Sequence, residues 1–395
     1  MQSWLASVLY GGVDRLGGAG ALLVLMGVVA CGLAILVWSL TRPAGTVVPR
    51  LALAIVLLAI GVSYWTERPL TLGLVALCVA LLCAEGRLHP RWLVAIFWVW
   101  VNVHGSFPLG LLALGALAFG RRLDGERPAR ELEALKWALL GCLIGGLNPL
   151  GPRLLVFPVE LISKQGVLHN VIEWQSPAFT SQSDRAYLLL IVLSIVGLVR
   201  RPSWRAAVPL VVFVPLSLLS TRNIAVASIV VLPGAAAGLA GLGSLTGDVR
   251  RSTFRVAGAT LVALGAIFGV GAVRSGPLDL HDYPAAAVDY ARSAGLLAKG
   301  SRLVTQDFVG NYVDLVQGPQ HETFIDDRFD MLPSALVDDY VVLLGGKPGW
   351  QRILDRYEAS AVLWKRDTPL AQLLEESSSW TIVYRDGAYV IARRR

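Results

Sequence analysis

The segment that decides the fold runs from Trp92 to Arg122, WLVAIFWVWVNVHGSFPLGLLALGALAFGRR. Two apolar blocks, Trp92 to Val103 and Phe107 to Phe119, flank the short polar sequence NVHGSFP, and two arginines follow. Apolar helices of about 20 residues cross the roughly 30 Å hydrocarbon core of a bilayer, and short cytoplasmic loops retain Lys and Arg. The segment therefore predicts a membrane hairpin with its tip outside and its arginines in the cytoplasm.

The whole chain has the composition of a membrane protein. Of its 395 residues, 55% are hydrophobic and only 16% are charged, against about 25% charged residues in a soluble domain. We expect a polytopic α-helical protein with about ten spans, some of them short or hairpin-like, for which re-entrant segments are the alternative. The ten blocks are Ala19 to Leu40, Leu51 to Trp65, Leu70 to Ala84, Trp92 to Val103, Phe107 to Phe119, Leu135 to Leu147, Ala186 to Val199, Ala206 to Leu219, Ile224 to Leu245 and Val256 to Val273.

The charges indicate an orientation in the cell (plasma) membrane. Residues 1–274 carry a net charge of +11, whereas residues 275–395 carry −4. If all ten blocks cross, alternate loops place 15 basic residues on one side and 6 on the other, and the basic side is the cytoplasmic one. Both the N-terminus and residues 275–395 are then extracytoplasmic. The basic excess thus reflects topology, and we expect no nucleic-acid partner.

Three regions follow from these patterns. Residues 1–18 are expected to form an interfacial amphipathic segment, with Trp4 among its apolar residues. Residues 19–274 form the transmembrane bundle, with a long outer loop at 148–185 that contains a second amphipathic stretch, LLVFPVELISK. Residues 275–395 form a soluble α/β domain. The four cysteines all lie in apolar blocks, so neither a disulfide framework nor a cysteine metal site is expected.

In the C-terminal domain, periodicity predicts helices in PAAAVDYARSAG, SALVDDYVVLLGG, GWQRILDRYEA and PLAQLLEES. It predicts strands in SRLVTQD, ETFIDDRFD and ASAVLWKR, and a hairpin in SWTIVYRDGAYVIARR that turns at Asp386. Three carboxylates in FIDDRFD, those of Asp326, Asp327 and Asp330, can bind a divalent cation. The alternative is an acidic turn neutralised by Arg328.

The unusual polar residues collect at the predicted outer ends of the spans. Ionisable groups there pair or line a wet cavity, so this cluster is the candidate site. Ordinary alternatives remain open: Glu67 and Arg68 as an interfacial ion pair, His104 as a turn residue, and Arg222 as a snorkelling arginine. The candidate catalytic residues are Glu67, Glu173 and His104; the candidates for binding phosphate or substrate are Arg68, Asn102, Arg153, Trp174, Arg222 and Asn223.

Nearly the whole chain resembles a bacterial group of largely uncharacterised multi-pass membrane proteins. The motifs, in order, are QSWLASVLY, TERP, WVNVHGSFPLG, GLNPLGPRLLVFPVEL, IEWQSPAF and TRNI, followed by YPAAAVDY, GNY and FIDDRFD. That group is similar to the type-C glycosyltransferases. The resemblance implies transfer of a sugar from a polyprenyl-phosphate carrier on the extracytoplasmic face of the membrane.

The chain departs from this pattern at its start. Relatives of the pattern carry one more span and an outer loop with an acidic residue just ahead of the segment matching QSWLAS, and in type-C enzymes that loop supplies the essential carboxylate. Two explanations are open: a start codon assigned too late, which would add an eleventh span, or a degenerate protein.

Two functions follow as expectations. The first is a membrane glycosyltransferase of envelope glycan or glycoprotein assembly, with Glu67 or Glu173 as base, assisted by His104, and Arg68, Arg153 and Arg222 binding the phosphate. The second is a non-catalytic lipid-carrier-binding or transporter-like component of envelope polysaccharide assembly. Polar residues concentrated on one side favour surface chemistry over transport.

Overall fold

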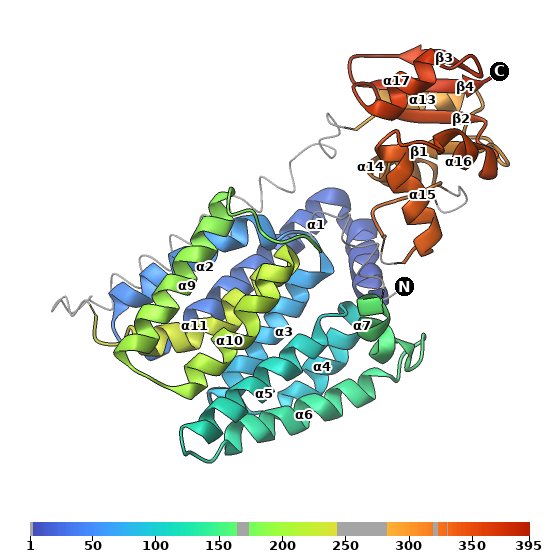
Figure 1. Ribbon diagram of the computed structural model, residues 1–395. Helices are drawn as coiled ribbons and strands as arrows, with labels where there is room; N and C mark the ends of the chain where they lie inside the picture. Colours follow the sequence, from blue (N-terminus) through green and yellow to red (C-terminus); the bar gives the residue numbers. More distant parts are fainter. Residues whose placement is uncertain (1–2, 164–173, 243–282, 319–322, 330) are drawn as a thin grey trace. The chain divides into compact units, whose positions relative to one another are not determined.

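The computed structural model describes residues 3–163, 174–242, 283–318, 323–329 and 331–395. These residues form two compact units, one before residue 243 and one after residue 282 (Figure 1). Each unit is described by itself below.

The first unit is built from helices, and each of the first nine predicted blocks largely coincides with one of them. The tenth block, Val256 to Val273, lies outside the described residues. Four of the described helices are long and apolar enough to cross a membrane: Trp4–Ala44, Val47–Tyr64, Gln182–Arg200 and Thr221–Gly238. The helices are α1 (Trp4–Leu40), α2 (Val47–Tyr64), α3 (Pro69–Ala84), α4 (Trp92–Val103), α5 (Phe107–Leu123), α6 (Ala129–Gly145), α7 (Arg153–Ser163), α9 (Gln182–Arg200), α10 (Trp204–Leu219) and α11 (Ile224–Gly238).

One predicted helix boundary is supported and another differs. The division expected between segment 1–18 and the following block coincides with a kink in α1, where the backbone angles of Gly17 and Gly18 are not helical. Gly18 has φ = 61° and ψ = −158°, which an L-residue with a side chain rarely adopts. By contrast, α11 ends at Gly238 although the apolar block continues to Leu245. Hydrophobicity alone therefore did not locate the end of α11.

The helices of this unit pack closely at small residues. A Cβ atom added at Gly238 of α11 would lie 2.4 Å from the Gly197 backbone of α9, so only glycine permits this crossing. Helix α11 is buried on almost every side. The core therefore centres on α11, with α9, α10, α2 and α3 packed around it.

Contacts between helix ends show that consecutive helices run in opposite directions, so that alternate connections lie at the same end of the unit. At one end of the unit, Arg205 Nη2 donates to Glu85 Oε1 (2.8 Å) and its Nε donates to Glu131 Oε1 (3.0 Å). At the opposite ends of the same helices, Arg222 Nη2 lies 3.1 Å from His104 Nε2. We call these the Glu131 end and the His104 end.

The second unit contains a four-stranded sheet with the order β1-β2-β4-β3. Strands β1 and β2 are parallel, whereas β4 is antiparallel to both β2 and β3. The strands are β1 (Leu303–Thr305), β2 (Ala361–Lys365), β3 (Trp380–Arg385) and β4 (Tyr389–Arg394); the helices are α13 (Ala285–Ser293), α14 (Asp307–Gln317), α15 (Ser334–Leu344), α16 (Trp350–Arg356) and α17 (Pro369–Glu376). Among the elements predicted in this region, four helices and four strands are present.

One predicted strand is wrong, and one helix was not predicted. The described part of ETFIDDRFD, residues 323–329, contains no strand. The Asp326 carboxylate accepts a hydrogen bond from the Arg328 amide (2.8 Å), which closes a local turn in place of strand pairing. The unpredicted helix, α14, contributes Gly310, which leaves room for the Ile325 carbonyl.

The hairpin between β3 and β4 turns at Asp386, as predicted. Asp386 Oδ1 accepts hydrogen bonds from the amides of Ala388 and Tyr389, both at 2.7 Å, and Oδ2 accepts one from the Tyr384 hydroxyl at 2.7 Å. Partial burial alone would raise the pKa of Asp386. The hydrogen bonds outweigh burial and hold this pKa below the usual carboxyl range.

Candidate functional site

The site begins at His104, which lies between α4 and α5 and is buried. Its Nδ1 lies 2.9 Å from Ser106 Oγ, and its Nε2 lies 3.1 Å from Arg222 Nη2. A guanidinium nitrogen can only donate, so Nε2 must accept and the ring proton must be on Nδ1. In the other tautomer Nδ1 would accept from the Ser106 amide (3.2 Å), but the Nε2 proton would then point at the Arg222 guanidinium. His104 is therefore neutral and its Nδ1 donates to Ser106 Oγ.

Arg222 lies in the short turn Thr221–Asn223 that joins α10 to α11. Its guanidinium carbon is 5.2 Å from the centroid of a Trp174 ring, a cation–π contact. The Thr221 amide donates to the Gln175 carbonyl at 2.9 Å, which ties the loop before α9 to this turn. We call His104, Trp174 and Arg222 the Arg222 cluster.

The cluster rests on a packed support. Trp100 of α4 is buried, and its Nε1 donates to Ser106 Oγ at 3.0 Å. Glycines on two neighbouring helices accommodate the Trp100 indole, because a Cβ atom would lie 2.7 Å from it at Gly73 and 2.5 Å from it at Gly110. The imidazole that faces Arg222 is thus held by Ser106, which is itself held by Trp100 packed against α3 and α5.

Asn102 was predicted to bind substrate, but the structure shows a packing role. Its Oδ1 accepts from Trp4 Nε1 (2.7 Å), and its Nδ2 donates to the carbonyls of Trp98 (2.7 Å) and Gly145 (3.3 Å). With no exposed surface, Asn102 anchors the start of α1 to α4 and α6. Asn223, next to Arg222, likewise donates to a backbone carbonyl, that of Leu216 (3.0 Å).

The remaining outer candidates lie at the His104 end with exposed side chains. Glu67 and Arg68 occupy the turn between α2 and α3, and Arg153 begins α7. Glu67 is close enough to the Tyr10 hydroxyl to interact with it electrostatically. Glu173 lies outside the described residues. Of the predicted site residues, the structure therefore brings together His104, Trp174 and Arg222.

The predicted acidic metal site stays a prediction. Asp326 is buried and forms an ion pair with Arg328, which supports the neutralised-turn alternative. Asp330 lies outside the described residues. Within the ranges that are described, no three His, Cys, Asp or Glu residues are grouped as metal ligands.

The sequence analysis missed an ion-pair network at the Glu131 end. The loop GRRLDGERPAR was counted only for its basic residues, whereas Glu131, directly after it, is fully buried between Arg205 (3.0 Å) and Arg121 (3.4 Å). Asp124 also accepts from Ser203 Oγ (2.8 Å) and the Trp204 amide (2.7 Å), which caps α10. The signal was present as acidic residues in and beside a basic loop, but their partner Arg205 lies far away in the sequence, at the start of α10.

Comparison with known proteins adds no relative. No protein-family model matches the chain, and no curated protein matches it. The class is therefore defined by the fold: a helical membrane protein with several apolar helices and a small C-terminal unit built on a sheet.

Proposed function

We propose that this protein is an extracytoplasmic membrane glycosyltransferase-like protein that binds a lipid-phosphate-linked sugar for envelope glycan or glycoprotein assembly. The observation that carries the proposal is the position of Arg222. Its guanidinium lies at the His104 end of a helical membrane unit, beside a buried histidine and an aromatic ring. A cation in this position suits a phosphate that reaches the site from the membrane surface.

The neutral state of His104 supports phosphate binding by Arg222. Because His104 accepts from the guanidinium and carries no charge, it orients Arg222 without cancelling its positive charge. The Trp174 ring also restrains the Arg222 guanidinium, through the cation–π contact. In the proposed reaction Arg222 stabilises the departing phosphate, and His104 is a positioning residue.

Sugar transfer also needs a base that accepts the proton of the acceptor. We assign this role to Glu67 or Glu173, with Arg68 and Arg153 as further contacts for the anionic donor. The exposed turn that carries Glu67 lies at the same end as Arg222, which supports this choice.

The proposal includes ten crossings with the His104 end and the C-terminal unit outside. The distribution of basic residues in the sequence supports this orientation, since ten crossings would place 15 of them on the cytoplasmic side and 6 on the other. The ion pairs at the Glu131 end also neutralise two of these arginines, Arg121 and Arg205. Such pairing lowers the penalty of placing charge near the bilayer.

A second function, carrier binding without transfer, is favoured by the chemistry of the Arg222 cluster. A guanidinium, an indole and a neutral imidazole bind a phosphate-linked sugar well. None of these three groups is a strong base in this arrangement. In this second function the protein binds the lipid-phosphate-linked sugar but does not transfer the sugar to an acceptor.

The test measures both steps on purified full-length protein. Polyprenyl-phosphate sugars are titrated to give the Kd, and transfer to a glycan or peptide acceptor is followed separately. Arg222→Ala removes a charge-assisted interaction worth about 1.5–3 kcal/mol, so donor affinity should fall about 10- to 150-fold. Arg185→Ala is the matched control, because Arg185 is an exposed arginine at the start of α9.

The outcomes separate the two functions. Transfer that is lost in Arg222→Ala and retained in Arg185→Ala supports the enzyme. Binding that depends on Arg222 without transfer supports the carrier-binding protein. If no donor binds, or if both variants bind it as the original protein does, both functions are wrong.

A further inference from the structure

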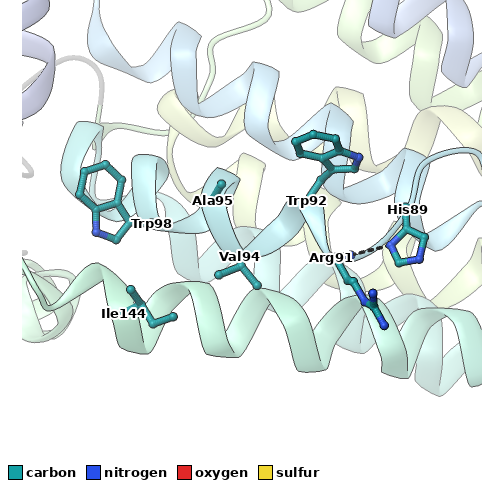
Figure 2. Close-up of a pocket in the computed structure, with 7 residues that line it drawn as sticks. All are labelled: His89, Arg91, Trp92, Val94, Ala95, Trp98 and Ile144. Carbon is teal, nitrogen blue, oxygen red and sulfur yellow. Dashed lines mark hydrogen bonds between the residues drawn. The ribbon is translucent and has the colours of Figure 1, made fainter.

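A groove runs along the face of α4 that borders α6. It is a shallow groove, open to its surroundings, of about 730 Å³, and it is lined by Arg91, Val94, Ala95 and Trp98, with Ile144 from α6. Residues spaced by three and four lie on one face of a helix, so these side chains form a continuous stripe. Figure 2 shows Trp98 and Ile144 at one end of this groove, and His89 and Arg91 at the other.

A second, polar hollow adjoins the basic end of the groove. It encloses about 400 Å³ between the loop before α4 and the start of α6, and it is lined by Arg87, Arg130 and Glu133. His89 lines both hollows, so they meet at this side chain. Both lie away from the Arg222 cluster, because Arg91 precedes α4 and His104 follows it.

The two hollows have complementary chemistry. The groove is apolar along α4, whereas three arginines and one glutamate surround the junction, an excess of positive charge. His89 Nδ1 accepts a hydrogen bond from the Arg91 amide at 3.3 Å, which leaves the ring proton on Nε2 as a donor. Trp92, 65% exposed beside Arg91, is typical of the boundary between lipid tails and headgroups.

We propose that this pair of hollows binds one anionic phospholipid, with an acyl chain in the groove along α4 and the phosphate among Arg87, His89, Arg91 and Arg130. Basic pockets between helices at the cytoplasmic side of a membrane are suited to anionic headgroups. The apolar groove continues from the basic pocket along the helix, as the tail of a lipid would. A free phosphate would use the polar hollow alone and leave the groove without a role.

The test uses delipidated full-length protein and native mass spectrometry. Phosphatidylglycerol and phosphatidylcholine with the same acyl chains are titrated in parallel, and inorganic phosphate is the third probe. We expect a first bound phosphatidylglycerol of higher affinity than phosphatidylcholine. Arg91→Gln and Arg130→Gln should each weaken its binding roughly fivefold, because a basic residue near an anionic surface contributes about that factor.

Filling the groove tests the position of the acyl chain. Ala95 is exposed, so Ala95→Trp places an indole in the groove without entering the core, and phosphatidylglycerol binding should fall at least tenfold. Val99→Trp is the steric control, since Val99 is an exposed residue of α4 that does not line the groove. Arg122→Gln, at the end of α5, is the charge control.

Three results would overturn the proposal. One is equal affinity for the two phospholipids. Another is an equal effect of Ala95→Trp and Val99→Trp, or of Arg91→Gln and Arg122→Gln. The third is tight binding of inorganic phosphate that Ala95→Trp leaves unchanged, which would identify the polar hollow as a phosphate site.

Discussion

Replacing His104 by Phe tests the role of the histidine in holding Arg222. The change keeps an aromatic ring in the buried position but removes Nε2, which lies 3.1 Å from Arg222 Nη2. A hydrogen bond to a charged group is worth about 1.5–3 kcal/mol, and the cation–π contact with Trp174, worth about 0.5–2 kcal/mol, still restrains the guanidinium. The net loss of donor binding should be about 1 kcal/mol, or roughly fivefold in Kd.

The assay is titration of a polyprenyl-phosphate sugar into the purified variants. His104→Gln is the matched variant, because its amide oxygen can accept from Arg222 and should restore the Kd to within about twofold. A double-mutant cycle adds Arg222→Ala, in whose background His104→Phe should have no further effect. If His104→Phe weakens binding equally with and without Arg222, His104 does not act through the arginine and the reasoning fails.

Two further predictions concern stability. Glu131→Gln removes the buried charge between Arg205 and Arg121 but leaves Arg205 its 2.8 Å contact with Glu85, so we expect a loss of about 2 kcal/mol of unfolding free energy, seen as a lower Tm. Glu126→Gln, an exposed partner of the same Arg121, should change Tm little, and equal shifts in the two variants would contradict the prediction. In the second unit, folding lowers the pKa of Asp386. Its carboxylate therefore stabilises the hairpin at pH values above the unfolded carboxyl pKa of about 3.9. This stabilisation is lost as the pH falls through the lower pKa of the folded state. Protection of the Ala388 and Tyr389 amides from hydrogen exchange, corrected for intrinsic rates, should decrease below about pH 4 and lose this dependence in Asp386→Asn; an unchanged profile in the variant would refute it.

Much of the first unit follows from the apolar blocks and from the distribution of basic residues between them. The hairpin at NVHGSFP was predicted because one long helix would have removed the excess of basic residues on one side of the membrane. In the structure α4 ends just before His104 and α5 begins shortly after it. The end of α11 at Gly238 could not be predicted in this way, because the residues after it are equally apolar. The kink at Gly18 depends on a backbone conformation that the sequence permits but does not require.

The candidate site was predictable in part. Arg222 and His104 were selected because ionisable residues at span ends are unusual, and they contact each other across 118 positions of sequence. Asn102 was selected as another polar residue at a predicted span end, yet its hydrogen bond with Trp4 makes it a packing residue. The Glu131 network was missed because the sequence shows which residues are charged but does not show which of them neutralise one another in ion pairs. Residue type therefore selected the positions, and tertiary contacts then showed which of them lie together and which are tied into the helix packing.

Photocrosslinking with a polyprenyl-phosphate sugar that carries a reactive group next to the phosphate tests the central claim most directly. The donor is bound to the full-length protein, irradiated, and the labelled peptides are sequenced. The account predicts labels in peptides that contain His104, Trp174 or Arg222, and their loss when unlabelled donor competes. Labels confined to the α4 groove near Arg91, or labels that competition does not reduce, would contradict it.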